Sequence, residues 1–360
     1  MDFASDNSVG ASAEILAAVA AANAGAAHAY GDDDWTAKAQ SRLDEIFERK
    51  TASFLVATGT AANALALAVL TPPYGAVFCH SSAHIMEDEC GAPEFFTAGA
   101  KLVGIDGAAG KITPEALKAA LAAFPRGLVT HVQPAVLSLS QATECGTLYT
   151  CAEIAELAAI AHAMGIAVHM DGARFANALV AQNCTAAEMS WKAGVDVLSF
   201  GATKNGALAC EAVVFFNPQQ AENFVYRRKR GGHTLSKGRF LGAQMAAYLE
   251  AGHWLALAAG ANAHAARLAA GLAQVPGIRL VWPCVANEIF LLVPEKVDRF
   301  LRGAGAHYYD WTFTAVDRAL AKPGDDAIFI RLVTSFATEP AEIAQFLAIA
   351  GAAATTSTKA

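Results

Sequence analysis

The sequence predicts an α/β protein built around a mainly parallel sheet of about seven strands. Short apolar runs with the length of buried strands recur over the first two thirds of the chain, and stretches with apolar residues at helical spacing lie between them. Two of those stretches begin with residues that favour a helix start. Because strands and helices alternate, neighbouring strands should run in the same direction, with helices packed on the faces of the sheet.

Seven runs are predicted to form the strands of this sheet. In chain order they are SFLVA at 53–57, GAVFCH at 75–80, KLVGI at 101–105, RGLVTHV at 126–132, GIAVHM at 165–170, DVLSFG at 196–201 and EAVVFF at 211–216. Helices are expected between them at 61–69, 113–124 and 150–165. Thr113 precedes Pro114, and Thr150 precedes Glu153 as in a capping box, which are patterns typical of a helix N-terminus.

The pattern changes after residue 226, where the basic connector RRKRGGHTLSKGR is followed by Ala-rich helices from about 239 to 274. A smaller α+β domain is expected beyond it, with strands at 277–282, 287–293, 307–313 and 327–333 and a helix at 339–352. We therefore expect a large domain over residues 1–250, which includes the N-terminal segment. A small C-terminal domain should cover 251–350, and 351–360 should form a disordered tail.

The composition argues against nucleic-acid and membrane partners. The net charge of −7, from 33 acidic and 26 basic residues, gives no general attraction to nucleic acid or to anionic lipid. The mean hydropathy of +0.32 reflects many alanines, and the long uncharged stretch at 51–79 is interrupted by Gly59, Pro72 and Pro73. The first residues, MDFASDNSVG, carry acids where a signal peptide has basic residues. We expect a cytoplasmic enzyme that acts on a small molecule.

Neither a disulfide nor a metal site is predicted. The seven cysteines, an odd number, show no C-x-x-C spacing, so we expect reduced and mostly buried thiols. His80 and His84 could share a helix face as zinc ligands, but no carboxylate or Cys stands in a recognised arrangement with them.

Two reactive side chains follow neighbouring strands of the predicted sheet. Asp171 lies in HMDGARFANA at 169–178, and Lys204 lies in SFGATKNGAL at 199–208. In pyridoxal phosphate chemistry a Lys forms an imine with the cofactor, while a carboxylate keeps the pyridine nitrogen protonated. A solvated Lys is the alternative, but the small and apolar residues around Lys204 give little other reason for a charge there. The pair therefore predicts a Schiff-base site.

A phosphate-binding turn is predicted where the first strand meets its helix. Thr58, Gly59 and Thr60 stand between these elements, and free backbone N–H groups at a helix start attract a phosphate. Many such turns contain Gly and Thr only for the turn and the cap. Together with Asp171 and Lys204, phosphate binding becomes the better interpretation.

An ordered set of segments resembles the pyridoxal-phosphate-dependent threonine aldolase family, which has the aspartate aminotransferase-like fold, fold type I, and is related to the β-eliminating lyases. The resemblance covers most of the chain. It rests on ASDN at 4–7, AYGDDD at 29–34, TGTAAN at 58–63, His84, HMDGAR at 169–174, Lys204 and IRLVT at 330–334.

The resemblance implies a role for each matching residue. Lys204 and His84 would be catalytic, His84 also stacking on the pyridine ring and organising the base that acts on the substrate. The cofactor would be held by Gly59, Thr60, His84, Asp171, Arg174, Lys204 and Lys229, with Lys229 reaching the phosphate of a neighbouring subunit. The substrate carboxylate would be held by Ser5, Arg174 and Arg331, with Tyr30 close by. A homo-oligomer, a dimer of dimers, is implied.

Two segments depart from the family pattern. Thr203-Lys204-Asn205 replaces the usual Ser-Lys-Gly, and SLSQATECGTLY at 138–149 replaces a segment in which many relatives carry Glu-Asn-Thr-His. Gln141 within that segment and His131 before it do not restore the pattern. In the basic run at 227–230, the choice of Lys229 over Arg228 stays open, and a solvated connector is the alternative for the whole run.

The expected reaction is retro-aldol cleavage of L-threonine, L-allo-threonine or a related β-hydroxy-α-amino acid, such as a phenylserine-like one, to glycine and an aldehyde. β-Elimination and transamination are the nearest alternatives, since the cofactor residues are shared among them. A non-catalytic homologue is disfavoured, because a buried charge without a task is costly.

Overall fold

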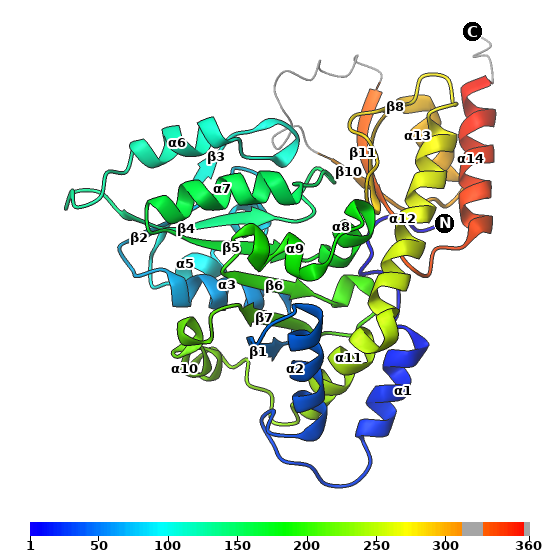
Figure 1. The fold of residues 1–360 in the computed structure, drawn as a ribbon. Helices are drawn as coiled ribbons and strands as arrows, with labels where there is room; N and C mark the ends of the chain where they lie inside the picture. Colours follow the sequence, from blue (N-terminus) through cyan, green and yellow to red (C-terminus); the bar gives the residue numbers. More distant parts are fainter. Residues whose placement is uncertain (312–326, 356–360) are drawn as a thin grey trace.

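The computed structural model describes residues 1–311 and 327–355 of the chain (Figure 1). Its larger sheet has seven strands in the order β1-β7-β6-β5-β4-β2-β3, of which β7 alone runs antiparallel to the others. The strands are β1 (Ala52–Val56), β2 (Gly75–His80), β3 (Lys101–Ile105), β4 (Gln133–Ser140), β5 (Ala167–Gly172), β6 (Val197–Gly201) and β7 (Glu211–Phe215). The predicted α/β class and the mainly parallel seven-stranded sheet are confirmed.

One predicted strand is wrong. Residues 126–132 form turns, with Val129 96 % exposed, and the strand β4 begins only at Gln133. The apolar side chains of the turn resemble those of a buried strand, whereas β4 contains Pro134, Ser138 and Ser140 among its apolar residues. Pro134 is tolerated near the start of β4. Ser138 lies buried within the sheet because its hydroxyl bonds to Nδ1 of His169 at 2.9 Å.

Helices cover both faces of this sheet, with α7 and α3 on opposite sides in Figure 1. Successive residues of β7 point to opposite faces of the sheet. Val213 packs with α3 on one face, while Val214 belongs to the core cluster that includes α7 on the other. The expected helix starts are present, since the threonines at 58, 113 and 150 each accept a hydrogen bond from the first turn. The helices of this part are α1 (Ala13–Ala22), α2 (Asp34–Ile46), α3 (Gly59–Leu70), α4 (His84–Glu87), α5 (Ala92–Phe96), α6 (Pro114–Ala122), α7 (Cys151–Ala163), α8 (Phe175–Gln182), α9 (Ala186–Met189), α10 (Phe224–Arg230) and α11 (Arg239–Leu249).

A second, smaller sheet forms the core of the C-terminal part. Its strands run antiparallel in the order β10-β11-β9-β8, and they are β8 (Arg279–Leu280), β9 (Glu288–Pro294), β10 (Tyr309–Asp310) and β11 (Ala327–Val333). The helices α12 (His253–Leu272), α13 (Glu295–Gly303) and α14 (Pro340–Thr355) pack with it. The predicted strand at 307–313 is therefore shorter, and its last two residues lie outside the described ones. The predicted tail is partly wrong, since residues 351–355 continue α14, while 356–360 are not described.

Two segments join the large and small parts. Phe3 is fully buried in the small core, and its backbone bonds to His307 and to Val333. Helix α12 contributes Trp254 to the large core and Leu268 to the small one. The domain boundary near residue 250 stays a prediction.

No helix in the described part of the chain is long and apolar enough to cross a membrane. None of the seven cysteines forms a disulfide in that part.

We predict that Phe200→Ala lowers the free energy of unfolding by about 3–5 kcal/mol, because the ring is fully buried among Phe47, Phe175 and Trp254 and its removal leaves a cavity. Urea denaturation followed by circular dichroism measures this. Phe95→Ala, at a ring that is 78 % exposed, is the control and should change stability by less than about 0.5 kcal/mol. Equal effects of the two substitutions would contradict the assignment of this core.

Candidate active site

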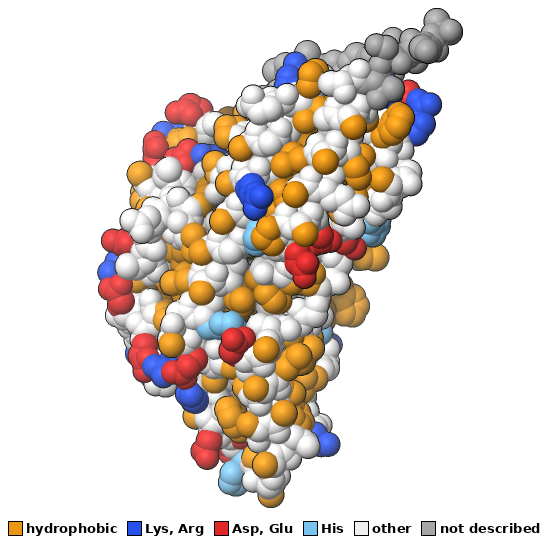
Figure 2. Space-filling view, turned by 90° about the vertical axis from the view of Figure 1, so that its right-hand side faces the viewer, with side chains coloured by type: hydrophobic (Ala, Val, Ile, Leu, Met, Phe, Trp, Pro, Cys, Tyr) orange, Lys and Arg blue, Asp and Glu red, His pale blue; other side chains and the backbone are white. Residues whose placement is uncertain are grey.

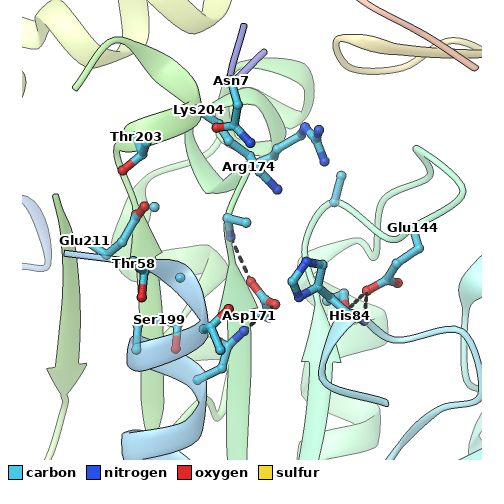
Figure 3. Close-up of a pocket in the computed structure, with 18 of the residues that line it drawn as sticks. Asn7, Thr58, His84, Glu144, Asp171, Arg174, Ser199, Thr203, Lys204 and Glu211 are labelled. Atoms are coloured by element: carbon cyan, nitrogen blue, oxygen red, sulfur yellow. Dashed lines mark hydrogen bonds between the residues drawn. The ribbon is translucent and has the colours of Figure 1, made fainter. Parts of the chain in front are cut away.

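Asp171 and Lys204 line one cavity of about 320 Å³ at the carboxyl ends of β5 and β6 (Figure 3). The two strands are paired so that Asp171 lies opposite Ser199, which also lines the cavity. In open α/β sheets, ligands bind at this edge of the strands. The predicted juxtaposition of an acid and an amine is therefore present.

One end of the cavity is formed by the start of α3. Thr58, Gly59 and Thr60 line it, and the Thr58 hydroxyl accepts a hydrogen bond from the N–H of Ala61 at 3.1 Å. The first turn of this 12-residue helix contains no acidic residue, so its N–H groups and dipole favour an anion. A Cβ at Gly59 would meet no atom within 4 Å, which leaves that side of the turn open.

A hydrogen-bonded chain orients the carboxylate and the imidazole of the cavity. Asp171 accepts hydrogen bonds from the N–H of Ala173 at 3.0 Å and from Nδ2 of Asn63 at 2.8 Å. Asn63 also donates to Glu89 at 2.8 Å, and the same Glu89 oxygen contacts Nδ1 of His84 at 2.8 Å. The hydrogen bond with Glu89 raises the pKa of His84 above its ordinary value. Sequence reasoning missed Asn63 and Glu89, because a polar residue on a helix or turn usually faces solvent.

These groups also bear on metal binding. One donor atom each from His84, Glu89 and Asp171 lies within 4.8 Å of the others, which is a spacing that could hold a cation. Nδ1 of His84, Oε1 of Glu89 and Oδ2 of Asp171 are engaged in hydrogen bonds within this group and with Asn63, while Oε2 of Glu89 is buried without a partner among the described residues. The absence of a metal stays a prediction. The pair considered from sequence does not meet, since the ring of His80 bonds to Ser82 at 2.7 Å and to the carbonyl of Gly107 at 2.9 Å.

The turn that carries Lys204 is fixed from two sides. The N–H of Ala202 donates to the buried carboxyl of Glu211 at 2.8 Å, and burial raises the pKa of Glu211 to about 7. Asn205 points away from the cavity and donates to the Tyr248 hydroxyl and the Trp254 carbonyl, both at 2.8 Å. The altered residue after the lysine therefore anchors the turn to α11 and α12.

A second cavity of about 510 Å³ adjoins the first, and it brings together three of the four predicted substrate residues, Ser5, Arg174 and Arg331. Ser5 and Arg331 line the second cavity but not the first. The residues that line both cavities are Asn7, His84, Glu144, Arg174 and Lys204. The shared residues mark the junction at which a substrate would meet a group bound in the first cavity.

The two arginines lie on either side of a buried carboxylate. Arg174 donates from Nε and Nη2 to both oxygens of Asp6, at 2.8 and 3.1 Å, and its Nη1 lies 3.2 Å from Glu288. Arg331 lies 3.6 Å from the other oxygen of Glu288, with its guanidinium over the Trp311 ring at 4.2 Å. Arg331 therefore has more of its donors available for a substrate carboxylate than Arg174 has.

Asp6 is ionised in this arrangement. Burial alone would raise its pKa, but the charges of Arg174 and Lys204 and hydrogen bonds from Arg174 and Asn287 outweigh burial and hold the pKa below its ordinary value.

Two predicted residues lie outside both cavities. Lys229 places Nζ over the ring of Tyr30 at 4.7 Å, and Tyr30 is 54 % exposed. Arg228, by contrast, lies over the Phe54 ring at 5.5 Å and donates to the Leu55 carbonyl at 3.3 Å. Lys229 is thus exposed and Arg228 half-buried, and the role of Lys229 stays a prediction.

The segment at 138–149 contributes a carboxyl group that sequence reasoning missed. Gln141 is buried and pairs with the backbone of Tyr149 at 2.8 and 3.0 Å, and His131 lies in the exposed turn before β4. Neither residue lines either of the two cavities described above. Glu144 lines both, and its Oε1 accepts hydrogen bonds from the Ser140 hydroxyl at 2.7 Å and the His84 N–H at 2.8 Å.

A family model of the β-eliminating lyases matches residues 2–295. The chain belongs to the β-eliminating lyase family. Within it, the chain is 46 % identical over 307 residues to the low specificity L-threonine aldolase of Pseudomonas aeruginosa, covering 85 % of this chain and 88 % of that protein. It is 44 % identical, with the same coverage, to the low specificity L-threonine aldolase of a Pseudomonas species.

A solved structure is also similar to this chain. The threonine aldolase of Leishmania major superposes with a TM-score of 0.89 at 30 % identity, covering 97 % of this chain and 98 % of that one. The resemblance to threonine aldolases and the fold expected from it are thus confirmed, and the family is one of lyases.

We predict that Asp6→Asn destabilises the protein at neutral pH by about 3–5 kcal/mol, because it leaves Arg174 buried with an incomplete partner. Since the folded-state pKa of Asp6 is lowered, its contribution is complete above the unfolded pKa of about 4 and is lost as pH falls through the folded value. Urea denaturation from pH 7 downward measures this. The difference in free energy of unfolding between wild type and Asp6→Asn should become smaller toward low pH. Asp32→Asn, at an exposed position, should show no such difference at any pH.

Proposed function

We propose that this chain is a pyridoxal-phosphate-dependent aldolase that cleaves L-threonine, L-allo-threonine or a related β-hydroxy-α-amino acid to glycine and an aldehyde. The observation that carries the proposal is the meeting of Lys204 and Asp171 in one cavity. The names of the Pseudomonas relatives support the reaction and the range of substrates.

The donor groups of the first cavity match the parts of pyridoxal phosphate. The N–H groups at Gly59 and Thr60 suit its phosphate, the Asp171 carboxylate suits a protonated ring nitrogen, and the His84 imidazole can stack on the ring. The amine of Lys204 suits the aldehyde carbon. When bound, the cofactor withdraws electrons from the α-carbon of an amino acid attached to it.

The protein's own groups perform the remaining tasks. Asn63 and the N–H of Ala173 fix the Asp171 carboxylate, which would hold a proton on the ring nitrogen of the bound cofactor. Glu89 holds the His84 ring through Nδ1. The fixed turn around Lys204 would present its amine to the aldehyde carbon of the cofactor.

The second cavity suits the substrate. Ser5 and Arg331 can hold the α-carboxylate at its wall, and we keep Arg174 among these residues with its orientation set by Asp6 and Glu288. A volume of about 510 Å³ leaves room for side chains larger than the methyl group of threonine. A tolerant substrate range follows.

We predict that Lys204→Ala abolishes aldehyde release from β-hydroxy-α-amino acids and removes the visible absorption of the cofactor-loaded protein, because the amine that binds the cofactor is gone. Lys118→Ala, at an exposed lysine of α6, should leave both unchanged. Spectra and an aldehyde assay over a panel of threo and allo substrates measure the effect. Normal turnover by Lys204→Ala would defeat the proposal.

Product analysis separates this reaction from its nearest alternative, β-elimination, after which the family is named. Glycine with an aldehyde supports the aldolase. Ammonia with a keto acid would support β-elimination, and a keto acid with aminated cofactor would support transamination.

We also propose that the chain is a homo-oligomer, a dimer of dimers, in which Lys229 reaches the phosphate site of a neighbouring subunit. The exposed Lys229 and Tyr30 lie away from the cavities of their own chain, so a role at a site calls for a second copy. Apolar side chains gather on the surface around α1, where Leu16 is 47 % exposed (Figure 2). A cytoplasmic location remains a proposal, which fits cysteines without a disulfide among the described residues.

Complementation tests the shared site. We predict that Lys229→Ala weakens cofactor affinity, and that co-expression of Lys204→Ala with Lys229→Ala subunits restores activity, because one site of a mixed pair then has both lysines. Light scattering of the purified protein gives the number of subunits. Restored activity is not expected if Lys229 serves its own chain, and Arg230→Ala should bind the cofactor normally on its own.

A further inference from the structure

Glu144 lines both cavities, and one oxygen of its carboxyl group, Oε2, is buried. The residue belongs to the turn after β4, in the segment where the sequence departs from many relatives. In the view of Figure 3, the His84 ring lies between Asp171 and Glu144. A substrate whose α-carbon meets the cofactor in the first cavity would carry its β-carbon and hydroxyl past this junction.

The two oxygens of Glu144 differ in their surroundings. Oε1 accepts hydrogen bonds from the Ser140 hydroxyl and the His84 N–H, at 2.7 and 2.8 Å. Oε2 is buried and has no hydrogen-bond partner among residues 1–311 and 327–355. An unpartnered buried oxygen is costly, so a partner is expected from a ligand. Oε2 is the atom that can exchange a proton with a bound hydroxyl.

The surroundings set the protonation of this carboxyl near neutrality. Burial raises the pKa of Glu144 to about 7, against the lowering effect of the hydrogen bonds from Ser140 and His84. The titratable groups that face it are Asp171 on β5, Cys79 on β2, and Cys145 and Tyr149 beyond the turn, together with His84, Lys204 and Arg174 in the shared cavity wall. A group with such a pKa can both accept and return a proton at neutral pH.

Other candidates at the junction are less suited to accept a proton. His84 holds Glu89 through Nδ1, which raises its pKa and favours its charged form. Glu288 is paired with both arginines, and Glu211 lines only the first cavity, with its carboxyl bonded to the N–H of Ala202. Lys204 is engaged by the cofactor under the proposed function.

We propose that Glu144 is the catalytic base of the cleavage, taking the proton of the substrate's β-hydroxyl on Oε2. The O–H bond breaks as the proton passes to Oε2, the β-carbon becomes the carbonyl carbon of the aldehyde, and the Cα–Cβ bond breaks. Its electron pair stays on Cα, which then takes a proton from solvent to give glycine. Oε2 releases its proton to solvent and is reset, so no proton is gained or lost overall, and in this scheme His84 organises the base through its backbone N–H. This assignment rests on the proposed function.

Glu144→Gln tests the role, since Gln keeps an acceptor for Ser140 and His84 but cannot take the proton. Retro-aldol kcat should fall about 10²-fold or more, with KM little changed. Exchange of the α-hydrogen of glycine with deuterated solvent does not involve a β-oxygen, so nuclear magnetic resonance should find it unchanged in the variant. Glu156→Gln, at an exposed position of α7, is the matched control and should behave as wild type.

The pH dependence and an infrared measurement add readouts that a structural role would not move. The wild-type kcat/KM should rise with pH through about 7 as Glu144 loses its proton, and the variant should lack this limb. In the protein without substrate or cofactor, the infrared band of a protonated carboxyl should disappear over the same pH range, and Glu144→Gln should lack that component.

The outcomes are distinct. Equal cleavage by wild type and Glu144→Gln, or equal loss of cleavage and of glycine exchange, would overturn the role of Glu144. A wild-type protein that releases no aldehyde from any β-hydroxy-α-amino acid would instead overturn the proposed function itself.

Discussion

The structure depends on a buried row of charges in which Asp6, Arg174, Glu288 and Arg331 follow one another. Asp6 belongs to the N-terminal segment, Arg174 follows the central strand β5, and Glu288 begins β9 of the small sheet. Two carboxylates and two guanidinium groups balance in charge, and a buried ion is tolerated only when paired in this way. Through this row the small sheet is held against the large one, and Arg331 is brought beside the cavity that contains Lys204.

The end of β5 couples that row to the cofactor site. Asp171 and Arg174 are separated by Gly172 and Ala173, so one turn of backbone orients both the carboxylate of the first cavity and the guanidinium shared by both cavities. A Cβ at Gly172 would lie 2.9 Å from the Ser199 carbonyl and 2.7 Å from Leu198. Glycine therefore lets β5 and β6 approach closely, which is what brings Asp171 near the turn of Lys204.

Sequence reasoning succeeded where one residue type and a strand end were sufficient. Asp171 and Lys204 stood out because a charge directly after a buried apolar strand is costly unless it has a partner or a chemical task. Gly59 and Thr60 stood out because they lie at the start of a helix. It failed for β4. The exposed turn at 126–132 contains apolar residues that resemble those of a strand, so the turn was predicted as the strand in place of the serine-containing run at 133–140. It also missed Asn63, Glu89 and Glu144, since their burial depends on which elements pack together, and a single polar letter on a helix or turn does not reveal that.

The two departures from the family pattern have different physical meanings. Asn205 faces Tyr248 and Trp254, so the change beside Lys204 acts on the stability of the turn and leaves the cavity wall as it is. The segment at 138–149 instead supplies Glu144 to the wall of both cavities. Because Ser140 and the N–H of His84 hold its Oε1, the direction of Oε2 is fixed, and Oε2 has no hydrogen-bond partner in the part of the chain that the structure describes. Differences in proton transfer between this chain and relatives with Glu-Asn-Thr-His should therefore arise from the turn after β4.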